Sequence, residues 1–109
     1  MGNDGHVFSA ALGSFFIYAT ARQDLCDIVA YLNTLSQETA EKYYDQLIRE
    51  IADLAQFPER HPHPRDRALK AKGYRYLLVK NYYVFYVVKE DTVQIRRILY
   101  ARRDYASLL

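Results

Sequence analysis

Basic and phenolic side chains dominate the last third of this 109-residue chain. Six residues near the C-terminus read YARRDY, with two arginines between two tyrosines. Arginine binds phosphate, and both tyrosine and arginine stack on nucleobases, so the segment suits a surface that binds a nucleic acid or a protein target. The same six residues would also suit a solvated tail. The candidates for a target-binding surface are Arg75, Lys80, Tyr83, Tyr100, Arg102, Arg103 and Tyr105.

Groups of these types can cleave RNA without a metal ion. One base takes the proton of the 2′-hydroxyl, arginines stabilise charge on the phosphate, and an acid protonates the leaving oxygen. Free lysine and tyrosine titrate near pH 10, so either needs a lowered pKa to act as the base. Simple binding by the same groups is the alternative. The catalytic candidates are Arg75, Lys80, Arg97 and Arg103.

The net charge of +2 conceals a strong asymmetry along the chain. Residues 1–59 carry three basic and nine acidic side chains, whereas residues 60–109 carry twelve basic and four acidic ones. Clustered Lys and Arg are typical of surfaces that bind nucleic acid, although solvated faces give the same count. The asymmetry therefore favours a polyanionic partner for the second half.

Other kinds of site find little support. His61 and His63 form an HPHP motif, but a zinc site needs three or four ligands, and His6 is the only other histidine. We expect no metal and no cofactor, since Gly-rich nucleotide loops and Ser-His-Asp arrangements are also missing from the sequence. The single cysteine, Cys26, excludes an intrachain disulfide. No apolar run is long enough to span a bilayer, and no signal peptide is evident, so we expect a cytoplasmic protein.

Hydrophobic patterning predicts an α+β fold. A short apolar run at 14–19 indicates a strand, and Thr20 and Gln23 have the spacing of a capping box at the start of a helix. A second helix is predicted over about 37–56, giving a helical hairpin. Residues 58–73, with three prolines, are predicted to be a loop. Three strands joined by tight turns follow, as an antiparallel meander that ends in a short C-terminal half-turn.

We expect one domain over residues 14–109, with the helical hairpin on one face of the sheet and the more exposed face rich in Arg, Lys and Tyr. Residues 1–13 match no element and are interpreted as a flexible arm or a cloning remnant.

The order of these elements resembles the RelE/ParE superfamily of toxins from bacterial type II toxin–antitoxin systems. The resemblance implies a toxin that arrests growth, often in a plasmid-stabilisation module, and a cognate antitoxin that binds it in a hetero-oligomer. It covers roughly residues 15–109. The segments that carry it are TARQDLCDIVAYL, AEKYYDQLIREIADLAQFPER, KGYRYLLVKNYYVFYVV and TVQIRRILYARRDYASLL.

Two activities are known in that superfamily, namely ribosome-dependent cleavage of mRNA and poisoning of DNA gyrase. Arg75 and Arg103 match basic positions of the ribonuclease branch, but Tyr83 stands where that branch usually has an arginine. Ala101 and Arg102 stand where some of these nucleases have a catalytic histidine and tyrosine. The C-terminal RRDYASLL is more similar to ParE-type endings. The resemblance thus favours gyrase as the target, with mRNA cleavage as the alternative.

Overall fold

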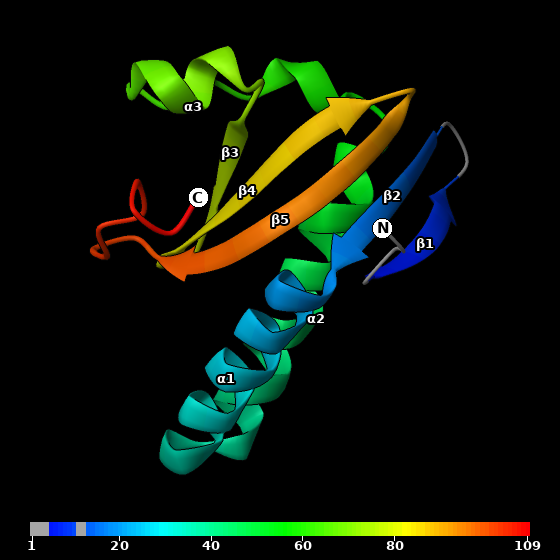
Figure 1. Ribbon diagram of the computed structural model, residues 1–109. Coiled ribbons are helices and arrows are strands. Elements are labelled where there is room, and N and C mark those ends of the chain that lie inside the picture. The colour runs from blue at the N-terminus through cyan, green and yellow to red at the C-terminus, as the bar shows by residue number, and fades with distance from the viewer. Residues whose placement is uncertain (1–4, 11–12) are drawn as a thin grey trace.

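A computed structural model describes residues 5–10 and 13–109, and it has the predicted α+β architecture. Five strands form one sheet, with two long helices on one face (Figure 1). The elements are β1 (Gly5–Ala10), β2 (Gly13–Tyr18), α1 (Ala19–Leu35), α2 (Gln37–Leu54), the 3₁₀ turn η1 (Pro58–Arg60), α3 (Arg67–Ala71), β3 (Arg75–Val79), β4 (Tyr82–Lys89) and β5 (Thr92–Tyr100).

The sheet has the order β1-β2-β5-β4-β3, so the first two strands join the far side of the meander. The meander is antiparallel, as predicted, while β2 runs parallel to β5. The β4–β5 turn places both Glu90 and Asp91 at positive φ, the backbone of a tight two-residue hairpin. The sequence offered no pattern for an element before residue 14, but Gly5–Ala10 pair with β2 along its full length.

Helices α1 and α2 form the expected hairpin, broken at the single residue Ser36. Its backbone is extended, its N–H donates to the Leu32 carbonyl, and its hydroxyl accepts from the Thr39 N–H at 3.2 Å. Ser36 therefore ends one helix and caps the next. Apolar residues at helical spacing, among them Leu25, Leu32, Leu47, Ile51 and Leu54, are buried against the sheet.

The start of α1 differs from the prediction. The helix begins at Ala19, and its N-cap residue, Tyr18, makes no side-chain capping bond. Thr20 donates instead to the Arg96 carbonyl on β5, and Gln23 donates to Asp27 one turn further along. The capping-box prediction is wrong because the neighbouring strand offers Thr20 a different acceptor.

The opposite face of the sheet is covered more than expected. Helix α3 and the segment after β5 pack over it (Figure 1), and a second apolar cluster lies beneath them. The prediction of a plain loop at 58–73 is wrong for η1 and α3. The buried members of the second apolar cluster are Leu69, Tyr74, Phe85, Val87 and Leu99, with Tyr76, Tyr83, Tyr105, Leu108 and Leu109 packed against them.

Candidate functional site

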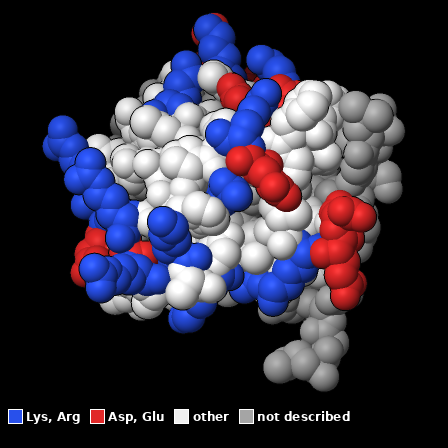
Figure 2. Space-filling view, turned by 90° about the horizontal axis from the view of Figure 1, so that it is seen from above, with Lys and Arg blue, Asp and Glu red and all other residues white. Residues whose placement is uncertain are grey.

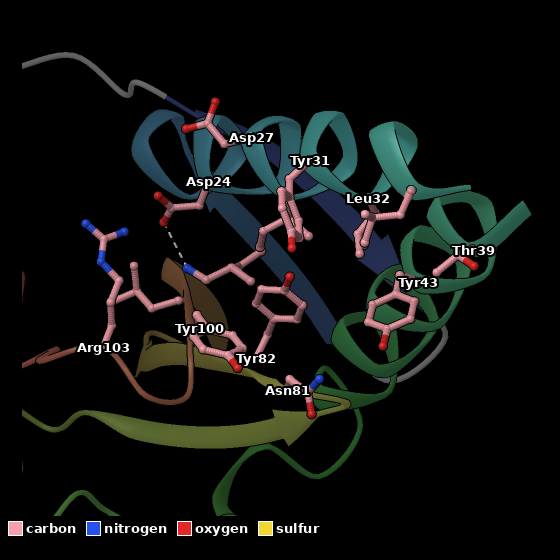
Figure 3. A pocket seen from close by; sticks show the side chains of 14 residues that line it. Asp24, Asp27, Tyr31, Leu32, Thr39, Tyr43, Asn81, Tyr82, Tyr100 and Arg103 are labelled. Atoms are coloured by element: carbon pink, nitrogen blue, oxygen red, sulfur yellow. Dashed lines mark hydrogen bonds between the residues drawn. The ribbon is translucent and has the colours of Figure 1, made fainter. Parts of the chain in front are cut away.

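A groove of about 640 Å³ lies between the helical hairpin and the ends of β4 and β5 (Figure 3). Helix α1 supplies one wall, the start of α2 closes one end, and the β3–β4 turn and the residues after β5 form the rest. The groove is open to solvent and mainly apolar or phenolic. The lining residues are Asp24, Asp27, Ile28, Tyr31, Leu32, Leu35, Thr39, Tyr43, Asn81, Tyr82, Ile98, Leu99, Tyr100 and Arg103.

Tyrosine rings define the shape of the groove. Tyr82 packs edge-to-face against Tyr43, with ring centroids 6.3 Å apart, and against Tyr100 at 5.9 Å. Tyr31 of α1 points toward this pair from the other wall (Figure 3) and is 60% exposed, and Leu35 is 65% exposed. Exposed apolar side chains gathered in one concavity are typical of a surface that another protein segment covers.

Asp24 joins the groove to the edge of the sheet. Beyond Ile95, β5 has no β2 partner, so the Ile98 N–H would lack an acceptor; the Asp24 carboxylate accepts it at 2.9 Å. The same carboxylate accepts from Arg97 Nε at 2.7 Å and Nη2 at 2.9 Å. Hydrogen bonding to Asp24 raises the pKa of Arg97. Asp24 therefore locks α1 onto β5 beside the groove.

The groove carries charge at its rim. Asp27 is exposed on α1. Arg103 lies across the groove from it, at the same end of the groove (Figure 3). Lys80, in the β3–β4 turn, lies with its ammonium 5.4 Å from the Tyr43 ring centroid. A segment bound here would thus meet an apolar floor and charges of both signs at its ends.

The residues singled out from the sequence do not converge on one place. Tyr100 and Arg103 line the groove, and Lys80 lies at its edge through its contact with Tyr43. Arg102 is exposed in the turn after β5. Arg97 is held by Asp24 and donates to the Leu108 carbonyl at 3.3 Å.

The remaining candidates lie elsewhere on the sheet. Arg75 starts β3, pairs with Tyr86 far from the groove, and donates to the His61 carbonyl at 2.7 Å. Tyr83 and Tyr105 pack together on the opposite face, with ring centroids 6.1 Å apart. Here a smaller cavity of about 220 Å³ is lined by Arg65, Tyr76, Tyr83, Phe85 and Tyr105.

Two phenols have raised pKa values, which makes them less suited to act as general bases. Burial, with smaller contributions from neighbouring tyrosines, raises the pKa of Tyr82. Burial raises the pKa of Tyr86 to about 12, although Arg75 opposes the shift, and its hydroxyl donates to the Pro58 carbonyl. Neither hydroxyl is prepared to give up its proton near neutral pH.

The histidine motif lies apart from the groove. His61 packs edge-on against Tyr86, and burial, followed by the charge of Arg60, lowers its pKa. The His63 ring nitrogen Nδ1 bonds the Tyr74 carbonyl at 2.7 Å. Within residues 5–10 and 13–109, no three His, Cys, Asp or Glu side chains come close enough to hold a metal ion. No helix in these ranges is long and apolar enough to cross a membrane.

The sequence also matches the family model described as ParE toxin of type II toxin-antitoxin system, parDE, over residues 16–105. The chain belongs to the ParE toxin family. It is therefore a toxin of a type II toxin–antitoxin system, with an antitoxin as its partner. A chain from a solved structure described as the chromosomal ParDE TA system from P. aeruginosa has the same fold, with a TM-score of 0.70 and 21% sequence identity. That match covers 85% of this chain and 100% of the other. No curated protein matches the sequence.

Sequence reasoning missed several groove residues of this ParE-family toxin. Asp24, Ile28, Tyr31 and Leu35 follow one another at helical spacing and share one stripe of α1. A carboxylate within an apolar stripe was the available signal, because a solvated acid would lie on the other side of the helix.

Proposed function

We propose that this toxin arrests growth by binding DNA gyrase and poisoning it, and not by cleaving RNA. The observation that carries the proposal is the dispersal of the basic and phenolic groups. Metal-free cleavage of RNA needs a base, an acid and charge-stabilising groups around one phosphate. Here Arg75 is bonded to the His61 carbonyl and paired with Tyr86, away from Arg103, which lines the groove. Arg97, beside the groove, is held by Asp24.

The ion pairing, pKa values and packing of the individual side chains also support gyrase as the target over RNA cleavage. The Arg97 guanidinium is bound to a carboxylate, which reduces the positive charge available to a phosphate. The raised pKa values of Tyr82 and Tyr86 make these phenols poor bases. Tyr83, in place of the expected arginine, packs between the rings of Tyr76 and Tyr105. A toxin that acts through binding needs none of these groups to move a proton.

Ribosome-dependent cleavage of mRNA is the second candidate, and one observation favours it. Lys80, Tyr100 and Arg103 all lie at or beside the groove, so a cation, a phenol and a second cation are available there.

We also propose that the groove receives the antitoxin. Its exposed Tyr31 and Leu35 and its tyrosine floor suit the apolar side of an amphipathic segment, and its length along α1 suits a helix or an extended strand. The resulting complex is a hetero-oligomer in which the antitoxin covers Arg103 and Tyr100.

Two reactions with purified components test the choice of target. The first contains gyrase and supercoiled plasmid, and the second contains ribosomes translating a defined mRNA that is mapped by primer extension. We expect gyrase-dependent DNA cleavage and intact message. Cuts in the message that require ribosomes, with gyrase unaffected, would overturn the gyrase proposal.

Matched variants connect the target to the rim of the groove. Arg102→Ala with Arg103→Ala is expected to abolish growth arrest while the protein still folds, since both side chains are exposed. Arg22→Ala with Arg49→Ala removes the same charge from exposed positions on α1 and α2 and should leave growth arrest unchanged. Equal toxicity of the two double variants would show that the segment after β5 is a solvated tail.

A further inference from the structure

Positive charge is concentrated on the segment between α2 and β3, away from the groove. Residues 60–75 carry six basic side chains and one acidic one, while the rest of the chain carries nine basic and twelve acidic. Lys and Arg gather at the left of Figure 2, the side on which Figure 1 shows both α3 and the segment after β5. We call the exposed basic residues of this segment the basic platform. They are Arg60, Arg65, Arg67, Lys70 and Lys72.

The loop that supports the basic platform is fixed to the sheet although its sequence is irregular. The Tyr86 hydroxyl donates to the Pro58 carbonyl, and the Tyr76 N–H donates to the Pro62 carbonyl at 3.1 Å. Further along, Arg75 donates to the His61 carbonyl, and His63 bonds the Tyr74 carbonyl. These contacts hold the loop at four successive points along residues 58–63.

Helix α3 is held equally firmly. The Asp66 carboxylate accepts from the Leu69 N–H at 3.1 Å, and the Leu69 side chain is buried under the helix. Gly73 turns the chain with φ of 86°, and the Tyr74 N–H then donates back to the Leu69 carbonyl. Arg67 and Lys70 therefore project from a fixed backbone and not from a mobile loop.

The charges of the basic platform are not neutralised by carboxylates of the described chain. The ion pairs within residues 5–10 and 13–109 are Lys42–Glu38 and Arg97–Asp24, both elsewhere. Asp66 is the acid within the platform, and its carboxylate caps α3. A rigid group of unpaired cations is suited to a ligand that is itself a regular array of anions.

The rings available here point to a duplex ligand. Single-stranded nucleic acids are bound by stacking unpaired bases on exposed aromatic rings. Tyr74, the tyrosine within residues 60–75, is only 6% exposed. Phe57 is 58% exposed, but it lies outside this segment, with the Arg60 guanidinium 6.0 Å from its ring centroid. Backbone phosphates of a duplex need cations alone, since the bases are stacked inside.

We propose that the basic platform binds the phosphodiester backbone of duplex nucleic acid, without regard to sequence. This inference goes beyond gyrase poisoning, because it requires neither gyrase nor the groove. Duplex DNA and duplex RNA present the same backbone chemistry, so the test includes both.

The test measures the fluorescence anisotropy of a labelled duplex of mixed sequence titrated with the purified toxin over a series of salt concentrations. Each phosphate contact contributes about 0.9 to the slope of log affinity against log salt. Arg67→Gln with Lys70→Gln should therefore make the slope shallower by about 1.8 and weaken binding roughly tenfold at low salt. Arg22→Gln with Arg49→Gln is the matched control and should bind like the unmodified protein.

Three outcomes would overturn the proposal. They are absence of duplex binding at low salt, equal loss of binding in the two double variants, and tighter binding of a single strand than of either duplex. A preference between duplex DNA and duplex RNA identifies the ligand within the proposal. Because gyrase and ribosomes are not present, a negative result here is separate from a failure of the gyrase assay.

Discussion

Replacing Asp24 with alanine should destabilise the protein strongly, although the residue lies at the groove and not in the apolar core. Its carboxylate accepts three hydrogen bonds, two from Arg97 and one from the Ile98 N–H. The two charged side chains are only 11% and 21% exposed, so water replaces little of what is lost. Without Asp24, the Arg97 guanidinium loses its counter-charge and the Ile98 N–H loses its acceptor.

The magnitude follows from these contacts. A hydrogen bond to a charged group contributes about 1.5–3 kcal/mol, and removing one partner of a buried ion pair costs about 3–5 kcal/mol. Because the pair is partly solvated, we expect Asp24→Ala to lower the free energy of unfolding by about 3 kcal/mol. For a domain of this size that is a fall in the melting temperature of roughly 10–20 °C. Asp24→Asn keeps an oxygen acceptor and should lose about half as much.

A double-mutant cycle with Arg97→Met isolates the pair from the remaining contacts. Chemical denaturation of the four proteins gives the coupling energy, which we expect to be about 2 kcal/mol. The free energies of the two single variants would then add to much more than that of the double variant. Additivity within about 0.5 kcal/mol would refute the reasoning, because Asp24 and Arg97 would then act independently.

Three further changes test other parts of the fold. Gly73→Ala should lower the free energy of unfolding by about 1 kcal/mol because of the positive φ alone, since an added Cβ would meet Val87 at an ordinary 3.8 Å. Thermal melting of the variant measures this loss. Because the pKa of Tyr86 is raised to about 12, the free energy of unfolding should fall by about 2 kcal/mol as the pH rises from about 10 to 12. Tyr86→Phe should remove this part of the pH dependence, which denaturant titrations measure. Leu35→Asp, at an exposed site, should leave growth arrest intact and abolish neutralisation by the antitoxin; co-expression measures both.

Much of the fold follows from patterns that act over a few residues. The meander was predictable because strand-forming runs alternate with two-residue turns, as at Glu90-Asp91, and the helical hairpin because apolar residues recur at helical spacing on either side of Ser36. Each of these signals concerns groups that are neighbours in sequence. The structure therefore confirms the leading strand, the helical hairpin and the meander in the predicted order, with η1 and α3 as unpredicted elements between the hairpin and the meander.

The parts that sequence reasoning missed depend on contacts between distant segments. Asp24 and Arg97 form an ion pair although they are 73 residues apart in the sequence, and no local sequence pattern predicts this pair. Helix α3 is one and a half turns long, too short for a hydrophobic period, and it exists because Leu69 finds a place in the second apolar cluster. The face expected to be exposed is covered for the same reason.

The YARRDY segment shows why a motif alone could not define the candidate site. Tyr100 ends β5 and faces the groove, whereas Tyr105, five residues later, packs on Phe85 of the opposite face, with ring centroids 4.9 Å apart. The chain turns around the end of the sheet between them, since the Ala101 N–H donates to the Asn81 carbonyl and the Arg103 N–H to the Tyr100 carbonyl.

The turn after β5 therefore places residues that are close in sequence on two different surfaces of the protein. Arg103 belongs to the groove, where we propose that the antitoxin binds, while Tyr105 secures the face that supports α3 and the basic platform. Residues after β5 thus stabilise one surface and line another. A substitution at Tyr105 should therefore act through the packing beneath α3, whereas one at Arg103 should act through the partner in the groove, and the two classes of effect can be measured separately.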